Sequence, residues 1–479
     1  MNHAAKWVYQ VSPVWTQNVL CTVAGHFRNW QRYDQEFPKQ IEFFQKASHW
    51  SLAEAETYQL DQLRQLLGYS HEKIAFYRQR FSDSKAVSGL PDLRSLDDWK
   101  KLPALSKDDV RKAGDRLVSS DFDPNHLVLS QSGGSTGMPL RCYHDPEALR
   151  QVYAHFWACQ RPGVSRQDKY ATFQGIEIIP ARQQGGPYWR MNRAMRQRLY
   201  SIFHLSEKTI GDYIADLDRY QPVYLAGYAN TLYLLATLAE EQNLRPAHSP
   251  RAIFTTSEQL LPGYRQTMER VFRTRVWDAY SQDETCGSIT QYECGFYHYD
   301  RAYGYMEFED METLPGNRRL AEIICTGFFN RAWPLLRYRP GDLVEYEPVE
   351  QCPRCGRAGP IIHAIRGRTG DVLLLPSGRR FPHISLIIKS LRGIRQVQLV
   401  QHAVDRITIR FVPSEDYRGA ADVEQLTSSF SQTVNEPILW QTEIVPEIPR
   451  TAGGKFMSIV SCLPANPDKI EPATNASFS

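Results

Sequence analysis

Strands and helices alternate through the middle of the chain, and this alternation constrains the fold more than any other feature. Short apolar runs at 223–225, 252–255 and 275–277 have the length and composition of buried strands. Amphipathic helical stretches at 231–241 and 263–272 separate them. Strands that alternate with helices form parallel pairs, so the pattern predicts a parallel α/β sheet. In such a sheet, ligands bind at the carboxyl ends of the strands.

Helices are expected before this region. Residues 51–54 form a capping box that begins an amphipathic helix, which we expect to end at Gly68. A second helix is expected to follow through Phe81. A further capping box at 106–109 begins a helix that runs toward Ala113.

In the last third of the chain, the alternation of strands and helices gives way to other patterns. Hairpin-like strands are expected at 321–325 and 335–338. Two strands and a helix beyond residue 367 indicate a small α+β unit, and the polar tail is expected to be disordered. The expected fold class is α/β, a large domain with parallel-rich sheets flanked by helices plus a β-rich subdomain, and a small mobile α+β domain. The expected boundaries are 1–366, 367–463 and 464–479.

Composition excludes several classes of protein. The chain has 479 residues, 42% of them hydrophobic, and a formal net charge of +3, so nothing indicates nucleic-acid binding. No apolar run is long enough to span a bilayer, and polar residues interrupt the N-terminal segment where a signal-peptide core would lie. We therefore expect a cytoplasmic protein that is not an integral membrane protein. Residues 7–30 are rich in Trp, Val and Phe; we expect them to pack on the main body, with contact to a surface as the alternative.

A run of glycines and hydroxyl residues at 132–139 follows a β-prone stretch. Its backbone N–H groups and hydroxyls suit a phosphate chain, although such runs also form plain flexible turns. The residues that would contact the phosphates are Ser132, Gly133, Gly134, Ser135, Thr136 and Gly137. The run formally matches the nucleophile elbow of a serine hydrolase, with Ser135 as the nucleophile. A strand-like stretch at 140–143 follows where that motif requires a helix, which disfavours the hydrolase.

Three cysteines and a histidine have the spacing of metal ligands. Cys294 and His298 form one short pair, and Cys352 and Cys355 form a Cys-x2-Cys turn. Two such pairs complete the tetrahedral shell of a structural zinc ion. A redox-active Cys-x2-Cys or unrelated buried thiols are the alternatives.

Five motifs occur in an order that resembles the adenylate-forming superfamily, which includes acyl-CoA synthetases, adenylation domains and luciferases. The motifs lie at 132–139, 280–284, 338–342, 367–368 and 454–455. The cysteine and histidine pairs resemble the phenylacetate-CoA ligase family within it. Segments at 12–18 and 375–382 resemble the branch that is often linked to capsule polysaccharide biosynthesis. The resemblance extends over nearly the whole chain.

This resemblance implies ATP-dependent activation of a carboxylic acid to an acyl-adenylate, followed by transfer to coenzyme A. It implies Lys455, Glu284 and Arg368 as catalytic residues, with Glu284 also holding Mg2+. Lys455 would bridge the substrate carboxylate and the α-phosphate, and Arg368 would reach ribose or phosphate. The remaining ATP-binding residues would be Ser257, Glu258, Tyr280 on adenine and Asp342 on the ribose hydroxyls.

The resemblance also implies where the acid binds. The candidate pocket residues are His155, Phe156, Phe173, Gly227 and Tyr228, although aromatic residues here are also ordinary core residues. No charged group there identifies the acid, and we expect a flat aryl or small unsaturated acid. Expected cofactors are ATP, Mg2+, structural Zn2+ and coenzyme A. A homodimer is one possible oligomeric state.

Two departures from the family pattern concern the second half-reaction, the transfer of the acyl group. Family members have an acidic hinge residue where this chain has Gly370, with Asp371 next to it. The glycine-bearing loop of the family is replaced by 376–380. An amine, an alcohol or a carrier-protein thiol is therefore an alternative acceptor, and a catalytically silent zinc-bearing scaffold is a third hypothesis.

Overall fold

Twelve strands form one mixed sheet in the part of the chain that the computed structural model describes. The described residues are 3–83, 92–131, 140–180, 183, 185–368, 373–378, 380–381, 393–434, 436–450 and 456–463. They divide into two compact units, of which the first covers residues up to 367 and the second most of the residues that follow.

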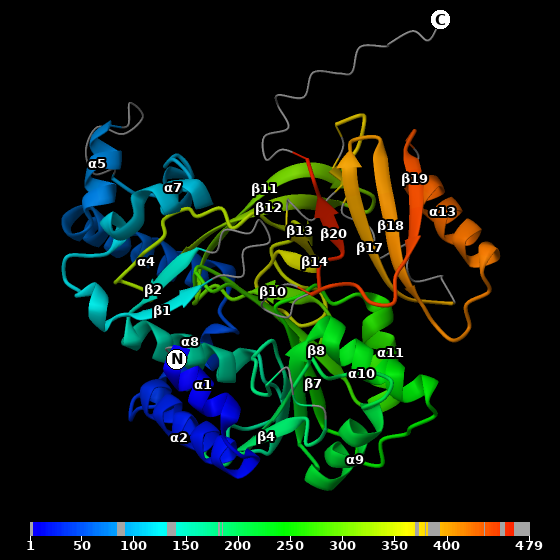
Figure 1. Ribbon diagram of the computed structural model, residues 1–479. Helices are drawn as coiled ribbons and strands as arrows, with labels where there is room; N and C mark the ends of the chain where they lie inside the picture. The colour runs from blue at the N-terminus through cyan, green and yellow to red at the C-terminus, as the bar shows by residue number, and fades with distance from the viewer. Residues whose placement is uncertain are drawn as a thin grey trace, which may run out of the picture. The chain divides into compact units, whose positions relative to one another are not determined.

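The helices of the first unit precede the sheet or alternate with its strands (Figure 1). They are α1 (His3–Val11), α2 (Val14–Arg32), α3 (Phe37–Ala47), α4 (Leu52–Lys73), α5 (Ala75–Asp83), α6 (Leu96–Lys100), α7 (Lys107–Ala113), α8 (Pro146–Cys159), α9 (Ile210–Tyr220), α10 (Ala229–Glu241) and α11 (Pro262–Phe272). The capping boxes expected at Ser51 and Ser106 are both present. In each, the serine oxygen accepts a hydrogen bond from a backbone N–H of the first turn, which stabilises the start of α4 and of α7.

The strands of the twelve-stranded sheet follow the order β11-β12-β13-β14-β10-β9-β8-β7-β6-β3-β5-β4. Their bounds are β3 (Tyr170–Phe173), β4 (Trp189–Asn192), β5 (Gln197–Tyr200), β6 (Tyr224–Tyr228), β7 (Ala252–Thr256), β8 (Val276–Ser281), β9 (Ser288–Gln291), β10 (Tyr297–Tyr299), β11 (Gly304–Leu314), β12 (Arg318–Gly327), β13 (Asp342–Glu347) and β14 (Ile361–Arg368). A separate hairpin pairs β1 (Val128–Gln131) with β2 (Arg141–His144).

The half of the sheet next to β4 is mainly parallel, as the alternation of strands and helices predicts. Strands β5, β3, β6, β7 and β8 run in the same direction. Helices α10 and α11 pack against this region, and Figure 1 shows both beside β7 and β8. At β8 the direction changes, because β9 pairs with it antiparallel. The expected mixed α/β fold class is confirmed.

The second unit contains a small α+β arrangement. Its four-stranded sheet has the order β19-β18-β17-β20 and packs helix α13 (Ala420–Val434). The strands are β17 (Ile394–Ala403), β18 (Arg406–Pro413), β19 (Leu439–Ile444) and β20 (Ile459–Ser461), with a short hairpin of β15 (Leu373–Leu374) and β16 (Arg380–Phe381).

Two local expectations are wrong. Helix α4 continues through Gly68 to Lys73, because the leucines beside the glycine are buried in the core and their packing outweighs its low helix propensity. Residues 335–338 do not form a strand. Arg337 has φ +49°, which breaks the extended conformation, and Tyr338 makes only isolated bridges to Cys325 and Leu105.

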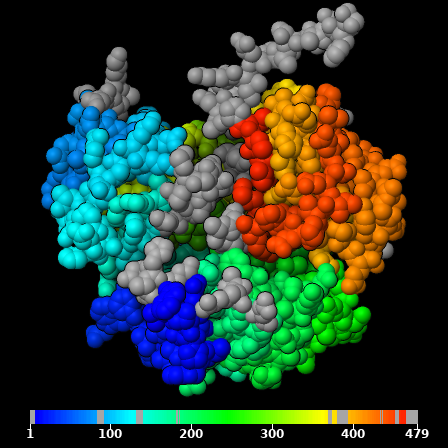
Figure 2. All heavy atoms as spheres, viewed as in Figure 1, coloured from blue at the N-terminus to red at the C-terminus, as the bar shows by residue number. Residues whose placement is uncertain are grey.

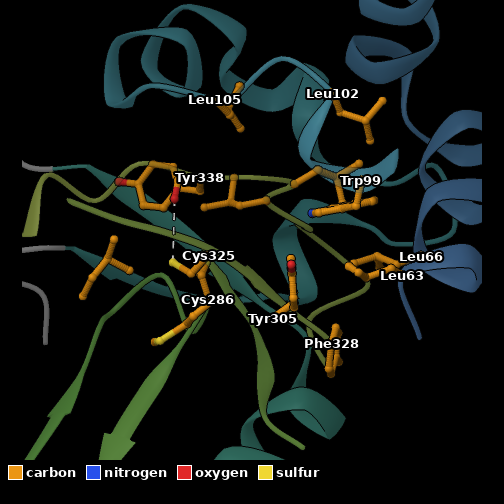
Figure 3. Packing of buried hydrophobic residues seen from close by; sticks show 14 of the residues in the cluster. Leu63, Leu66, Trp99, Leu102, Leu105, Cys286, Tyr305, Cys325, Phe328 and Tyr338 are labelled. Carbon is orange, nitrogen blue, oxygen red and sulfur yellow. Dashed lines mark hydrogen bonds between the residues drawn. The ribbon is translucent and has the colours of Figure 1, made fainter. Parts of the chain in front are cut away.

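The core beneath the antiparallel half of the sheet holds Tyr338 in place. Trp99 and Leu105 pack in the same cluster as Cys325 and Tyr338, as Figure 3 shows. The backbones of Cys325 and Tyr338 exchange two hydrogen bonds of 2.8 and 2.9 Å. The side chain of Tyr338 is therefore set by a packed core rather than by a mobile loop.

Gly227 provides a test of the close packing between β3 and β6. A Cβ atom at this position would overlap the carbonyl oxygen of Phe173, which is backbone and has no room to move. We expect Gly227→Ala to lower the free energy of unfolding by about 1–3 kcal/mol because of this overlap. Gly68→Ala is the matched control, because nothing lies within 4 Å of its Cβ position and the helix gains about 0.5–1 kcal/mol. Thermal and chemical denaturation of both variants measure the two effects, and a Gly227→Ala protein as stable as the parent would contradict the tight approach.

Candidate functional site

Three parallel strands end at one edge of the sheet and bring candidate residues there. Tyr228 ends β6, Ser257 and Glu258 directly follow β7, and Glu284 follows β8. Since β6, β7 and β8 are parallel neighbours, their carboxyl ends meet at this edge. Ser257 has φ +66°, so the chain leaves β7 in a left-handed conformation that costs free energy in a residue other than glycine.

Tyr280 and Asp342 lie in direct contact although they are far apart in the sequence. The hydroxyl of Tyr280 donates a 2.6 Å hydrogen bond to Oδ2 of Asp342, and the amide of Gln282 donates to the Tyr280 oxygen. Burial, and then the Asp342 carboxylate, raise the pKa of Tyr280 well above its usual range. The phenol therefore stays protonated and acts as a donor that fixes the carboxylate beside its ring.

Glu284 is buried and has a second phenol as its partner. The hydroxyl of Tyr338 donates a 2.9 Å hydrogen bond to Oε1 of Glu284. Burial, and then Glu284 itself, raise the pKa of Tyr338 far above its usual range. Sequence reasoning placed Tyr338 in a motif but gave it no role. Its contact with Glu284 spans 54 positions in the sequence, so only the fold reveals it.

Asp278 is a buried carboxyl group that sequence reasoning also missed. It lies within β8, where Thr255 donates a 2.5 Å hydrogen bond to Oδ1 and Tyr297 a 2.9 Å bond to Oδ2. Burial raises the pKa of Asp278 to about 6 despite these donors. An acid inside an otherwise apolar strand is the signal that would have found it.

Glu258 contacts the start of a helix. Its Oε2 accepts a 2.9 Å hydrogen bond from the backbone N–H of Asn230, in the first turn of α10. A carboxylate at a helix N-terminus is stabilised by the exposed N–H groups there. Glu258 thus connects the end of β7 to the start of the helix that follows β6.

The candidate acid-pocket residues fall into two groups. Phe173 and Gly227 are neighbours across β3 and β6, and the Phe173 ring stacks on Tyr200 with centroids 4.7 Å apart. His155 and Phe156 lie on α8. His155 is buried and forms a 3.0 Å ion pair with Asp300. Burial lowers the pKa of His155, but Asp300 and then Cys159 outweigh it and raise the pKa to about 10.

Phe156 contacts a buried cation. The guanidinium group of Arg161 lies 3.9 Å from the centroid of the Phe156 ring and 4.5 Å from that of Phe254, which belongs to β7. These cation–π contacts connect α8 to the parallel strands.

Several candidates lie outside the described residues. They are Ser132, Gly133, Gly134, Ser135, Thr136, Gly137, Gly370, Asp371 and Lys455. Arg368 is the last residue of β14, but the structure does not describe the side chain of Arg368. The strand β2 follows the glycine-rich run, where the nucleophile elbow of a serine hydrolase requires a helix.

The four predicted metal ligands come together in the fold. The ligand atoms of Cys294, His298, Cys352 and Cys355 all lie within 4.8 Å of one another. Cys294 lies in the turn between β9 and β10, His298 lies in β10, and the loop before β14 carries Cys352 and Cys355. Since β10 pairs with β14, the sheet itself brings the two pairs together.

The distances fit a tetrahedral zinc ion. The Nε2 atom of His298 lies 3.6 Å from Sγ of Cys294 and 3.4 Å from Sγ of Cys355. Zinc bonds of about 2.3 Å to sulfur and about 2.0 Å to nitrogen would separate such ligand atoms by about 3.6 Å. Burial, and then the nearby Arg357, lower the pKa of His298 to about 4, so the imidazole is neutral as a ligand must be.

The chain is similar to several known proteins. The model of the CapK C-terminal domain matches residues 380–462. The chain is 26% identical over 456 residues to protein CapK of Staphylococcus aureus. The aligned residues cover 94% of this chain and 97% of that protein. It is 24% identical over 371 residues to phenylacetate-coenzyme A ligase of Pseudomonas putida, covering 72% and 78% of the two chains.

The fold is shared with a solved enzyme. A crystal structure of 2-hydroxyisobutyryl-CoA ligase in the postadenylation state superposes with a TM-score of 0.66 at 20% identity, over 87% of this chain and 91% of that one. The fold is thus that of acyl-CoA ligases of the adenylate-forming superfamily. Within that class, the chain is homologous to CapK and to phenylacetate-CoA ligase, which confirms the resemblance inferred from its motifs.

Replacing one cysteine tests the metal centre. We expect Cys352→Ser to abolish stoichiometric zinc and to lower the melting temperature, because structural zinc contributes to folding free energy. Cys142→Ser is the control, since Cys142 is a buried cysteine outside the cluster. Elemental analysis of the purified protein measures the metal. Zinc-free parent protein, or a Cys352→Ser protein that keeps its zinc, would contradict the assignment.

Proposed function

We propose that the chain activates a carboxylic acid with ATP, forms an acyl-adenylate and releases pyrophosphate. One observation carries the proposal. The edge formed by β6, β7 and β8 carries Ser257, Glu258 and Glu284, three of the residues that the resemblance assigns to ATP and Mg2+, in a chain with the fold of adenylate-forming ligases. In the reaction, an oxygen of the substrate carboxylate forms a bond to the α-phosphorus, and the bond to the leaving pyrophosphate breaks.

The contact between Tyr280 and Asp342 supports a site for the nucleoside. The ring of Tyr280 would pack on adenine, and the carboxylate of Asp342 would accept hydrogen bonds from the ribose hydroxyls. Since the two side chains are joined by a 2.6 Å hydrogen bond, the base site and the ribose site would be adjacent. This bond orients the carboxylate before ATP binds, which lowers the entropy cost of binding.

The buried Glu284 supports a site for a divalent cation. Burying a carboxylate is costly unless donors or a cation compensate for lost hydration. Mg2+ bound there would neutralise charge on the phosphates as pyrophosphate leaves. Tyr338 would keep Oε1 oriented, and the residues at 132–137 would donate hydrogen bonds to the phosphates.

We further propose that the acid is aryl or small and unsaturated and that coenzyme A accepts the acyl group. Tyr228 at the end of β6 would lie nearest to such a substrate, whereas Phe173 is fully buried in the core and stacks on Tyr200. The departures at Gly370 and at 376–380 favour a second candidate, transfer to an amine, an alcohol or a carrier-protein thiol.

Pyrophosphate release across a panel of aryl and short acyl acids, with and without coenzyme A, tests the proposal. Release with one acid that rises with coenzyme A and yields a thioester supports the ligase. Release that ignores coenzyme A favours another acceptor. No release with any acid would overturn adenylation and favour the silent scaffold.

Lys455 is the proposed catalytic lysine, and its removal isolates the chemical step. We expect Lys455→Ala to lower acid-dependent pyrophosphate release by about a hundredfold or more, because it removes a charge that stabilises the transition state. Lys208→Ala, at an exposed lysine outside the site, should retain the parent rate. Parent-like release by Lys455→Ala, at an unchanged melting temperature, would show that this lysine is not catalytic.

Tyr338 is proposed to position Glu284 and not to contact the substrate. We expect Tyr338→Phe to raise the Mg2+ concentration that gives half-maximal rate by about tenfold, because residues that orient metal ligands affect metal affinity on this scale. Titration with Mg2+ at saturating ATP measures it. Tyr346→Phe removes a phenol that donates to Asp310 instead and serves as the control. A lower rate with no change in the Mg2+ requirement would contradict the positioning role.

A further inference from the structure

Helix α2 lies against the edge of the large sheet with its polar side inward. Asn18 accepts a 2.8 Å hydrogen bond from the backbone N–H of Met191, and Thr22 accepts one of 3.1 Å from that of Arg193. Asn29 donates to the carbonyl of Ala194 at 3.1 Å. These contacts cover the outer edge of β4, whose backbone groups would otherwise be open to pairing.

A buried glutamine completes this polar attachment. Gln17 is 2% exposed, and its amide donates to the carbonyls of Tyr9 and Ser12 while its oxygen accepts from the Arg190 guanidinium. Gly25, also buried, lets the helix approach Asn192 closely. The N-terminal segment thus contacts the main body through these hydrogen bonds and through Cys21, which packs against the core.

The apolar side of the two N-terminal helices faces outward as a result. We call the exposed residues the N-terminal apolar face; its members are Trp7, Val8, Val11, Trp15, Val19, Leu20, Val23, Phe27 and Trp30. In α2 they follow a spacing of three to four residues, so they form one stripe along a helix of roughly 28 Å. Figure 2 shows these two helices, in dark blue, at the surface of the molecule.

This concentration of apolar side chains is unusual within the described residues. Nine of the fifteen large hydrophobic side chains that are exposed there belong to this face. Trp15 is 69% exposed and Trp30 is 74% exposed. A contiguous exposed patch of this kind indicates an interaction surface.

The charge of the N-terminal segment favours an acidic surface as the partner of this face. Residues 1–33 contain three Lys and Arg residues and no Asp or Glu. The other 446 residues contain 53 of each sign, and the nearest acids in the sequence, Asp34 and Glu36, follow the segment directly. The exposed Arg193, in the turn that contacts α2, adds positive charge at its border. Glu177, which contacts Gln10 at 3.4 Å, is an acidic neighbour.

We propose that the N-terminal apolar face binds the surface of an anionic lipid bilayer. Helices that lie in a membrane interface combine an apolar face with basic residues, and tryptophan is enriched at the level of the lipid headgroups. The polar attachment of α2 to β4 would hold the helix axis along the protein surface, so the face would lie flat on the bilayer. Within the described residues, no helix combines the length and apolar content needed to cross a bilayer. This inference does not depend on the proposed reaction.

Flotation with lipid vesicles tests the proposal. The full chain is mixed with vesicles of phosphatidylcholine alone or with phosphatidylglycerol added, at low and high salt. We expect binding that requires phosphatidylglycerol and weakens with salt. Trp15→Ser combined with Trp30→Ser should weaken binding at least tenfold. Phe203→Ser, at an exposed apolar residue outside this face, should bind as the parent does.

The variants also separate the other possible occupant. Light scattering after size exclusion gives the oligomeric state of the parent and of the double variant. A parent dimer that the double variant dissociates, with no vesicle binding, would show that a second copy covers the face. Equal vesicle binding by parent and double variant, or none by a monomeric parent, would also overturn the proposal. Unchanged melting temperatures exclude misfolding as the cause.

Discussion

The backbone pairing of four parallel strands is the constraint on which the proposed site depends. Strands β3, β6, β7 and β8 share one direction, so their carboxyl ends meet at one edge. The close approach at Gly227 keeps β3 and β6 in contact, and β9 then reverses the direction beside β8. The turn that holds Glu284 lies where the parallel part ends. Residues that follow β6, β7 and β8 are thereby presented together at this edge.

Hydroxyl groups hold the buried carboxylates of this region. Tyr280 donates to Asp342, Tyr338 to Glu284 and Tyr297 to Asp278. A phenol orients a carboxylate but does not neutralise it, whereas an arginine or lysine would form an ion pair. A carboxylate oriented in this way would suit a divalent cation or sugar hydroxyls as its partner. The arrangement suits the proposed use of ATP and Mg2+ better than a set of ion pairs would.

Other parts of the sheet serve other purposes. The pairing of β10 with β14 brings the cysteine and histidine pairs together, and β9 separates these strands from the parallel part. Strand β4 is covered by α2, which uses amide and hydroxyl side chains where apolar packing is more usual. Because the polar side of α2 contacts β4, the apolar stripe of α2 stays exposed. This exposed stripe is the physical basis for the proposed membrane contact.

The sequence by itself determined the elements whose causes are local. The alternation between 223 and 277, the capping boxes and the metal-ligand spacing all depend on neighbouring residues, and the motif order was enough to reach the superfamily. Contacts between distant residues needed the tertiary structure. Only the fold connects Tyr338 to Glu284, carries α4 through Gly68 against propensity, and breaks the expected strand at Arg337. The outward direction of the N-terminal apolar face was likewise decided by the fold, because periodicity defines two faces of a helix but not which one meets the protein.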